Sequence, residues 1–180
     1  MRFNELYQKQ VRPALKKEFS YKSDLAIPRI TKVSLNVGVG RFTKDKAYVD
    51  GVVNTLTRIS GQKPVLTKSR KSISAFKVRE GQIVGVAVNL RGARMFDFLE
   101  KLINITFPRV RDFRGIDAKI IDRTGNMSIG FREHIAFPEV KADEIDNVHG
   151  LQITISTTAK TREEGFELFK LLGFPFKKTT

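Results

Sequence analysis

At residues 30–39 the chain reads ITKVSLNVGV, in which every second side chain is apolar. An extended chain places such alternating residues on opposite sides, so the stretch carries one apolar row and one polar row. The apolar row is Val33, Leu35, Val37 and Val39. The polar row is Lys32, Ser34, Asn36 and Gly38. The pattern predicts a half-buried β-strand, with the apolar row in the core and the polar row on the opposite face of the sheet.

Similar patterns along the chain predict the remaining elements. Strands are expected around 64–67, 73–78, 83–90 and 151–157, and residues 119–131 are expected to form a hairpin that turns at 124–126. Apolar periodicity predicts helices at 3–19, 45–60, 95–106 and 161–173. Pro13 should kink or restart the first helix, and the third should end before Pro108. The short connections predict an α+β fold, in which a mainly antiparallel sheet packs against helices on one face.

The length of 180 residues is typical of one domain, so residues 1–180 are expected to form a single domain with an extended basic β-hairpin loop. Positive charge is concentrated at one end of the chain. Residues 1–114 hold 24 Lys and Arg against 9 Asp and Glu, whereas residues 115–180 hold 9 against 10. A lopsided basic surface indicates a polyanionic partner, with nucleic acid as the first candidate.

The composition argues against several other classes. The chain has no cysteine, which removes disulfides and thiolate chemistry, and no apolar run approaches the roughly 20 residues that cross a bilayer. His134 and His149 are the only histidines and have no third ligand at metal spacing, so a structural role is expected for both. The glycine pair around Val39 indicates a tight turn rather than a dinucleotide loop. We expect no enzyme, no metal and no cofactor.

A basic segment at residues 67–81 reads TKSRKSISAFKVREG. Its five cations are Lys68, Arg70, Lys71, Lys77 and Arg79. They oppose a single acid, Glu80, and Phe76 lies among them together with several hydroxyl side chains. Cations and hydroxyls hold phosphates, and an aromatic ring can pack on a sugar or a base. The alternative is a solvated hairpin tip.

The polar rows of two strands form a second candidate surface. Its small and amide side chains are Ser34, Asn36, Gly38, Gly85, Ala87 and Asn89. Such a face can approach a sugar-phosphate backbone closely, and the amides can pair with base edges or 2′-hydroxyls. Packing against the chain's own helices is an equal alternative. Further positive charge comes from Arg91, Arg94, Arg109, Arg111 and Arg114.

Several motifs together resemble a known family. They are ISGQKP at 59–64 running into the basic segment, Arg91-Gly92, FPRVRDFRG at 107–115, FPE at 137–139 and GFPF at 173–176. This set resembles bacterial-type large-subunit ribosomal protein five, the 5S-rRNA-binding protein of the central protuberance. The resemblance covers essentially the whole chain.

The resemblance implies a non-catalytic ribosomal protein with one α+β domain. It implies 5S rRNA contacts at Lys32, Asn36, Gln62 and Asn89, although the family more often has threonine at the last position. It implies that the loop Thr67–Gln82 faces P-site tRNA, and that residues 109–150 meet small-subunit protein thirteen in an intersubunit bridge. Further implied partners are 23S-type rRNA and other proteins of the central protuberance. We expect a ribosome-bound protein, cytoplasmic or in an organelle.

Three other functions are weighed against this one. A non-ribosomal RNA chaperone would bind RNA by charge alone and show no preference for 5S rRNA. An enzyme acting on RNA lacks a plausible acid–base pair. The basic N-terminal helix could lie on anionic lipid, but its apolar stripe from Phe3 to Phe19 fits ordinary core packing better, so no membrane partner is expected.

Overall fold

The computed structural model describes residues 3–40, 42, 45–140 and 148–177. These residues fall into two compact units. Unit 1 comprises Met1–Val33, Leu90–Ile129 and Thr154–Thr180, and unit 2 comprises Ser34–Asn89 and Gly130–Ile153. Both units combine strands with helices, which confirms the α+β class. The expectation of one domain over residues 1–180 stays a prediction.

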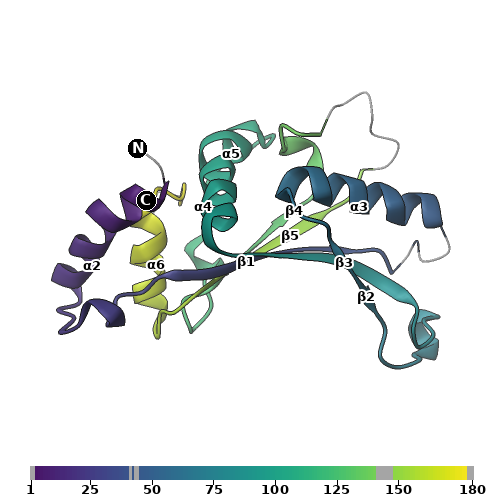
Figure 1. Ribbon diagram of the computed structural model, residues 1–180, viewed down its shortest axis with the longest axis horizontal. Coiled ribbons are helices and arrows are strands. Elements are labelled where there is room, and N and C mark those ends of the chain that lie inside the picture. The colour runs from purple at the N-terminus through teal and green to yellow at the C-terminus, as the bar shows by residue number, and fades with distance from the viewer. Residues whose placement is uncertain (1–2, 41, 43–44, 141–147, 178–180) are drawn as a thin grey trace. The chain divides into compact units, whose positions relative to one another are not determined.

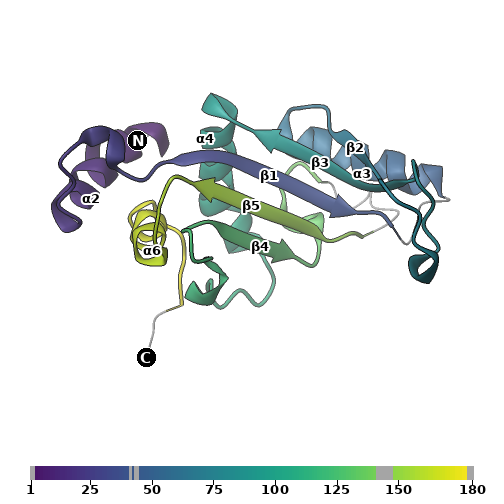
Figure 2. The same cartoon turned by 90° about the horizontal axis from the view of Figure 1, so that it is seen from below.

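Five strands form one sheet in the order β2-β3-β1-β5-β4. Their bounds are β1 Ile30–Gly38, β2 Val65–Lys68, β3 Ile83–Leu90, β4 Met127–Phe131 and β5 Leu151–Thr157. The arrows of β3, β1, β5 and β4 alternate in direction in Figure 2, and β2 pairs antiparallel with β3, Thr67 lying opposite Gly85. The mainly antiparallel sheet expected from the sequence is therefore confirmed, and β1, β3 and β5 lie at the predicted positions.

Unit 2 is built on helix α3, Lys46–Ser60, which covers one face of its strands (Figure 1). The helix begins where the Asp45 carboxylate accepts the backbone N–H of Tyr48 at 3.1 Å. It ends at Gly61, whose φ of +65° suits a residue without a side chain. The core side of α3 consists of Val49, Val52, Leu56 and Ile59. The predicted helix at 45–60 is confirmed.

Unit 1 is mostly helical and rich in phenylalanine. Its helical segments are α1 Phe3–Leu6, η1 Tyr7–Val11, α2 Arg12–Glu18, η2 Asp24–Ala26, α4 Gly92–Lys101, η4 Leu102–Thr106, α5 Phe107–Arg109, η5 Ala118–Ile120 and α6 Arg162–Leu171. Phe3 lies against Phe96, with ring centroids 6.3 Å apart, and so joins α1 to α4. Phe174 contacts both Phe107 and Phe169, which ties the end of the chain to α5 and α6. Aromatic packing thus holds unit 1 together.

Helix α6 begins with one half of a capping box. The Thr161 hydroxyl accepts the backbone N–H of Glu164 at 3.3 Å. The Glu164 carboxylate instead accepts the backbone N–H of Lys160 at 2.7 Å and the Tyr21 hydroxyl at 2.5 Å. Burial acts to raise the pKa of Glu164, but these hydrogen bonds together hold that pKa below its usual value.

The helix expected to end before Pro108 continues to Arg109. A π-helical segment, η4, precedes Pro108, and another, η1, precedes Pro13. A proline ring clashes with the carbonyl four residues earlier in a regular α-helix, and the wider π turn leaves room for the ring. The chain thereby passes both prolines without leaving the helical conformation.

Two segments expected to be strands are not. In 73–78 only Ile73 and Val78 pair, and Ser74–Phe76 form a 3-10 turn, η3, that ends at Lys77 with a φ of +53°. In 119–124 only Ile121 pairs, with Met127 at the start of β4. There the Asp122 carboxylate accepts backbone N–H groups of Thr124 and Asn126, and such local bonds compete with a strand ladder. The turn at 124–126 is confirmed.

Candidate nucleic-acid interface

The polar face of the unit 2 strands is uncovered by any helix that the structure describes in that unit. Asn36 on β1 and Asn89 on β3 are exposed, and Ser34 is half-buried. The Ser34 hydroxyl donates to Oδ1 of Asn89 at 2.7 Å, which leaves the amide nitrogen of Asn89 as a donor toward solvent. The sequence left two alternatives for this face, contact with RNA and packing against the chain's own helices. Because Asn36 and Asn89 are exposed, the face does not pack against the helix of its own unit.

Gly85 allows the side chains of Thr67 and Asn36 to come together on this face. A Cβ atom at position 85 would lie 2.6 Å from Oγ1 of Thr67 and 3.7 Å from Oδ1 of Asn36. The side chains of Thr67 and Asn36 therefore occupy the space above the glycine, and Gly85 itself is buried. The face is flat at this point because Gly85 contributes no side chain.

The remaining two residues implied for 5S rRNA are both half-buried. Gln62 is half-buried just after α3, where the hydroxyl of Ser60 accepts its backbone N–H at 3.2 Å. Lys32 is half-buried and belongs to unit 1. It occupies the same side of β1 as Asn36, because both stand at alternate positions of one strand. The structure thus places Asn36 and Asn89 on one face and fixes Gln62 at the end of a helix.

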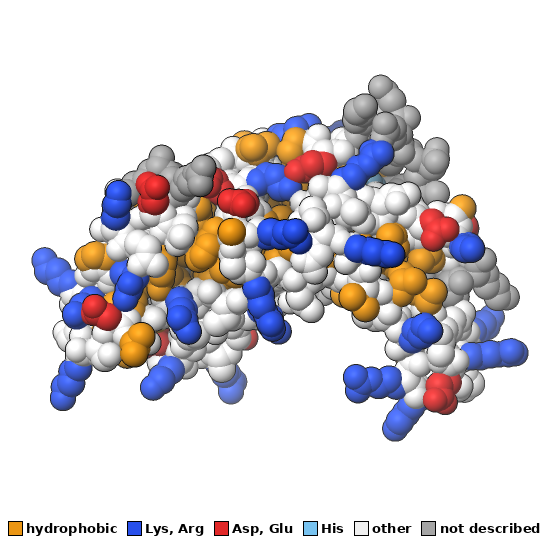
Figure 3. All heavy atoms as spheres, viewed as in Figure 1, with side chains coloured by type: hydrophobic (Ala, Val, Ile, Leu, Met, Phe, Trp, Pro, Cys, Tyr) orange, Lys and Arg blue, Asp and Glu red, His pale blue; other side chains and the backbone are white. Residues whose placement is uncertain are grey.

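The five cations of the basic loop are all exposed. None of them forms an ion pair with any residue in the described ranges. Figure 3 shows blue side chains projecting from this hairpin tip, with little red among them. Unpaired, exposed cations are free to bind phosphate, since no internal carboxylate competes for them.

A second group of cations surrounds the phenylalanine cluster of unit 1. Phe113 stacks on Phe107, with ring centroids 5.2 Å apart, and the chain turns at Asp112 with a φ of +54°. The anchored turn leaves its neighbours Arg109, Arg111 and Arg114 exposed. Arg91 and Arg94, at the start of α4, are exposed as well. The structure therefore presents all five arginines to solvent.

The two histidines form a buried stacked pair, which no pattern in the sequence indicated. Their ring centroids lie 3.9 Å apart and the rings are 6° from parallel. Burial lowers the pKa of both, that of His149 to about 4 with help from the charge of His134. Within the described residues no group of three metal-binding side chains comes together. The structural role expected for both histidines agrees with this geometry.

None of the helices in the described part of the chain is both long enough and apolar enough to cross a bilayer. The apolar stripe of the N-terminal helical segment is used in packing instead. Phe3, Tyr7, Val11 and Leu15 are buried, and the Tyr7 hydroxyl donates to the carbonyl of Pro28 at 3.0 Å. Phe19, the last residue of the predicted stripe, is half-buried.

Comparison with known proteins places the chain in a family. A family model described as ribosomal protein L5 matches residues 23–79, and a second model, for the C-terminus of the same ribosomal family, matches residues 83–176. The large ribosomal subunit protein uL5 of Desulfatibacillum aliphaticivorans is 55% identical over 172 residues, 96% of each chain. The uL5 proteins of Halothermothrix orenii and Colwellia psychrerythraea are 49% and 51% identical, over 97% and 98% of each chain. The chain therefore belongs to the bacterial-type ribosomal protein L5 family.

Proposed function

We propose that this protein is a structural, non-catalytic constituent of the large ribosomal subunit that binds 5S rRNA and helps to attach it in the central protuberance. Membership of the L5 family supports the ribosomal role. The family resemblance assigns the polar face of β1 and β3 to 5S rRNA, with Lys32, Asn36 and Asn89 as contacts, and adds Gln62 at the end of α3 as a further contact.

The observation that carries this proposal is the uncovered polar face of unit 2. Structured RNA presents 2′-hydroxyls and base edges on a wide, shallow minor groove, which suits a flat surface better than a projecting one. Asn36 and Asn89 supply paired donors and acceptors on such a surface, and the nearby hairpin supplies unpaired cations for phosphates. Direct polar contacts allow the protein to discriminate 5S rRNA from other RNAs, whereas the cations provide affinity and make binding depend on salt.

The other partners follow from separate surfaces. The basic loop Thr67–Gln82 is assigned to P-site tRNA because the family resemblance implies it, and its exposed cations, unpaired within the described residues, suit a polyanionic partner. The segment from Arg109 to about Gly150 is assigned to small-subunit protein thirteen, and residues 141–147 of it lie outside the described residues. Contacts with 23S-type rRNA and other proteins of the central protuberance complete the proposal, in a cytoplasmic or organelle ribosome.

Equilibrium binding tests the central claim. We expect the protein to prefer 5S rRNA at least about a hundredfold over an unrelated structured RNA of equal length at near-physiological salt, the scale of specific over non-specific binding. Asn36→Ala should weaken binding to 5S rRNA by about 1–3 kcal/mol, because it leaves a buried RNA group without its partner. Asn54→Ala is the matched control, since Asn54 is an exposed asparagine on α3.

The two outcomes separate the proposal from its rival. Selective binding that falls with Asn36→Ala and is unchanged by Asn54→Ala supports recognition by the sheet. Equal, steeply salt-dependent binding to both RNAs would instead identify a charge-driven RNA chaperone and remove Asn36 from the site.

A further inference from the structure

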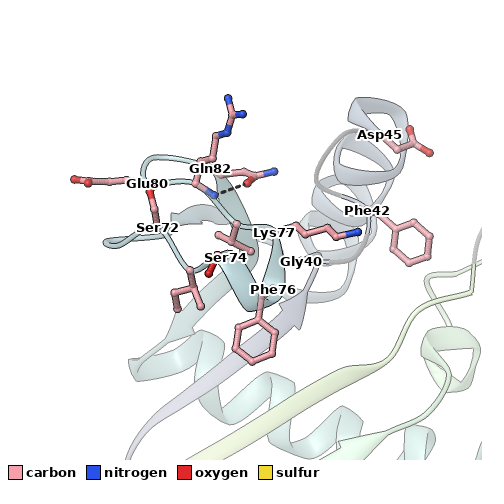
Figure 4. Close-up of a pocket in the computed structure, with 12 residues that line it drawn as sticks. Gly40, Phe42, Asp45, Ser72, Ser74, Phe76, Lys77, Glu80 and Gln82 are labelled. Carbon is pink, nitrogen blue, oxygen red and sulfur yellow. Dashed lines mark hydrogen bonds between the residues drawn. The ribbon is translucent and has the colours of Figure 1, made fainter.

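A groove of about 1300 Å³ lies within unit 2, beside the hairpin tip (Figure 4). One wall comes from the tip residues 72–74, 76–80 and 82, and the other comes from Gly40, Phe42 and Asp45, which precede α3. The groove has an unusual lining for a basic surface, since two exposed phenylalanines belong to it. Phe42 is 48% exposed and Phe76 is 74% exposed.

Phe42 is held in place by its own surroundings. Its ring lies against that of Tyr48 on α3, with centroids 4.4 Å apart. Its backbone N–H donates to the carbonyl of Val39 at 2.9 Å, and its carbonyl accepts the N–H of Asp45 at 3.0 Å. The Asp45 carboxylate is itself occupied in capping α3. This wall therefore offers a positioned ring beside a carboxylate of which one oxygen is bonded to the start of α3.

Phe76 is held by a tightly bonded turn. Ile73 and Val78 exchange backbone hydrogen bonds of 2.9 and 3.2 Å, and the N–H of Lys77 donates to the carbonyl of Ser74 at 3.0 Å. The side-chain oxygen of Gln82 accepts the N–H of Arg79 at 3.0 Å, as the dashed line in Figure 4 shows. The turn fixes an aromatic ring in solvent, an arrangement that costs free energy unless a partner covers the ring.

The charges around the groove indicate which partner would cover it. Lys77 and Arg79 line it, and the side chain of Lys77 extends toward the wall that carries Phe42 (Figure 4). Lys68, Arg70 and Lys71 continue the positive charge on the same hairpin, whose one acid, Glu80, lines the groove together with Asp45 of the other wall. An acidic peptide would pair with the cations, but its acidic side chains would not stack on the two phenylalanine rings. An unpaired nucleotide matches both, since its base has a π face and its phosphates are anionic.

We propose that this groove binds a base that is unpaired in the bound RNA, stacked on Phe76 with Phe42 bounding the site and with its flanking phosphates at Lys77 and Arg79. The inference rests on the proposed RNA-binding function. It goes further by naming the feature of the RNA that the hairpin tip recognises, which is an unpaired base. The tip would thereby distinguish an RNA with an extrahelical base from a continuous duplex of similar charge, which the cations alone cannot do.

The absence of tryptophan from the chain permits a direct test. Phe76→Trp places a single indole in the groove, and Leu25→Trp places one at a site in unit 1 where the side chain is 91% exposed. Each variant is titrated with an RNA hairpin carrying one bulged adenosine and with the same hairpin lacking the bulge. We expect saturable quenching of the indole at 76 by the bulged hairpin alone, and no selective quenching at 25.

Affinity measured with labelled RNA completes the test. The wild-type protein should prefer the bulged hairpin roughly tenfold, the scale of one base–aromatic stack, and Phe76→Leu should abolish the preference whereas Phe76→Tyr should retain it. Tight but equal binding of both hairpins, with no selective quenching at 76, would overturn the groove proposal while leaving RNA binding intact. Failure of both hairpins and of 5S rRNA to bind would overturn the proposed function itself.

Discussion

At the level of single residues, His134 and His149 tie the stability of unit 2 to pH. Their side chains are 3% and 6% exposed, and the backbone N–H of His149 lies 3.2 Å from Nδ1 of His134. A proton on either imidazole would put a charge into a buried stack, and a proton on both would add repulsion between the rings. The folded protein therefore holds the pair neutral, as the lowered pKa values of both residues show.

We predict that the free energy of unfolding falls as the pH is lowered below about 6.5. The unfolded chain takes up protons at the ordinary histidine pKa of 6.5, whereas folded His149 resists protonation until about pH 4. The unfolded state therefore binds more protons in this window and gains stability from acid. Between pH 7 and pH 5 the loss from His149 amounts to about 2 kcal/mol, measurable by urea unfolding.

The variant His149→Phe isolates this effect because it keeps an aromatic ring and removes the titrating group. Its unfolding free energy should depend less steeply on pH between 7 and 5 than that of the wild-type protein. The same pH dependence in both proteins would show that the histidine pair does not cause it.

At the level of elements, α6 rests on the turn at 122–126 with no room for a side chain between them. A Cβ atom at Gly165 would lie 2.5 Å from the Cα atom of Gly125 and 2.6 Å from its carbonyl oxygen. Both contacts are with backbone, so a rotamer change cannot relieve them. Gly125 also has a φ of +74° and is therefore a glycine for conformational reasons as well.

We predict opposite effects for the same substitution in two helices. Gly165→Ala should lower the free energy of unfolding by about 1–3 kcal/mol, because overpacking against Gly125 outweighs the better helix propensity of alanine. Gly51→Ala in α3 should raise it by about 0.5–1 kcal/mol, since nothing lies within 4 Å of its added Cβ. Chemical denaturation of both variants measures the difference. Stabilisation by Gly165→Ala would contradict the contact between α6 and the turn.

At the level of the whole molecule, the position of the positive charge should decide RNA binding, rather than its total of +14. We predict that the triple variant Lys68→Gln, Arg70→Gln, Lys71→Gln weakens RNA binding and reduces the slope of log K against log salt by roughly 2–3, because each lost phosphate contact removes about 0.7–0.9. The same loss of charge in the near-neutral part of the chain, by Lys119→Gln, Arg123→Gln and Lys177→Gln, should change the slope little.

Both triple variants replace exposed residues, so their folding should be equally preserved. The measurement is binding to tRNA, the partner assigned to the basic loop, over a series of salt concentrations. Equal reductions of the slope by the two variants would mean that only net charge matters, and would remove the basic loop from the proposed interface.

Much of the fold could be predicted from local patterns. Strict alternation located β1, β3 and β5, and apolar periodicity located α3 and α6, because each signal depends on near neighbours in the chain. The predicted strand was wrong where local hydrogen bonds competed with strand pairing, as around Asp122. The predicted helix end before Pro108 was also wrong, because the preceding π-helical segment accommodated a residue that usually ends a helix.

The sequence by itself determined the α+β class, the basic loop, the polar row on β1 and β3, and the family, since each of these depends on composition or on short-range order. Only the tertiary structure showed that Thr67 and Asn36 meet above Gly85, that His134 stacks on His149, and that Phe42 and Phe76 line one groove. These contacts join residues that are distant in the chain. Their geometry is set by how strands pair and loops close, which no local periodicity encodes.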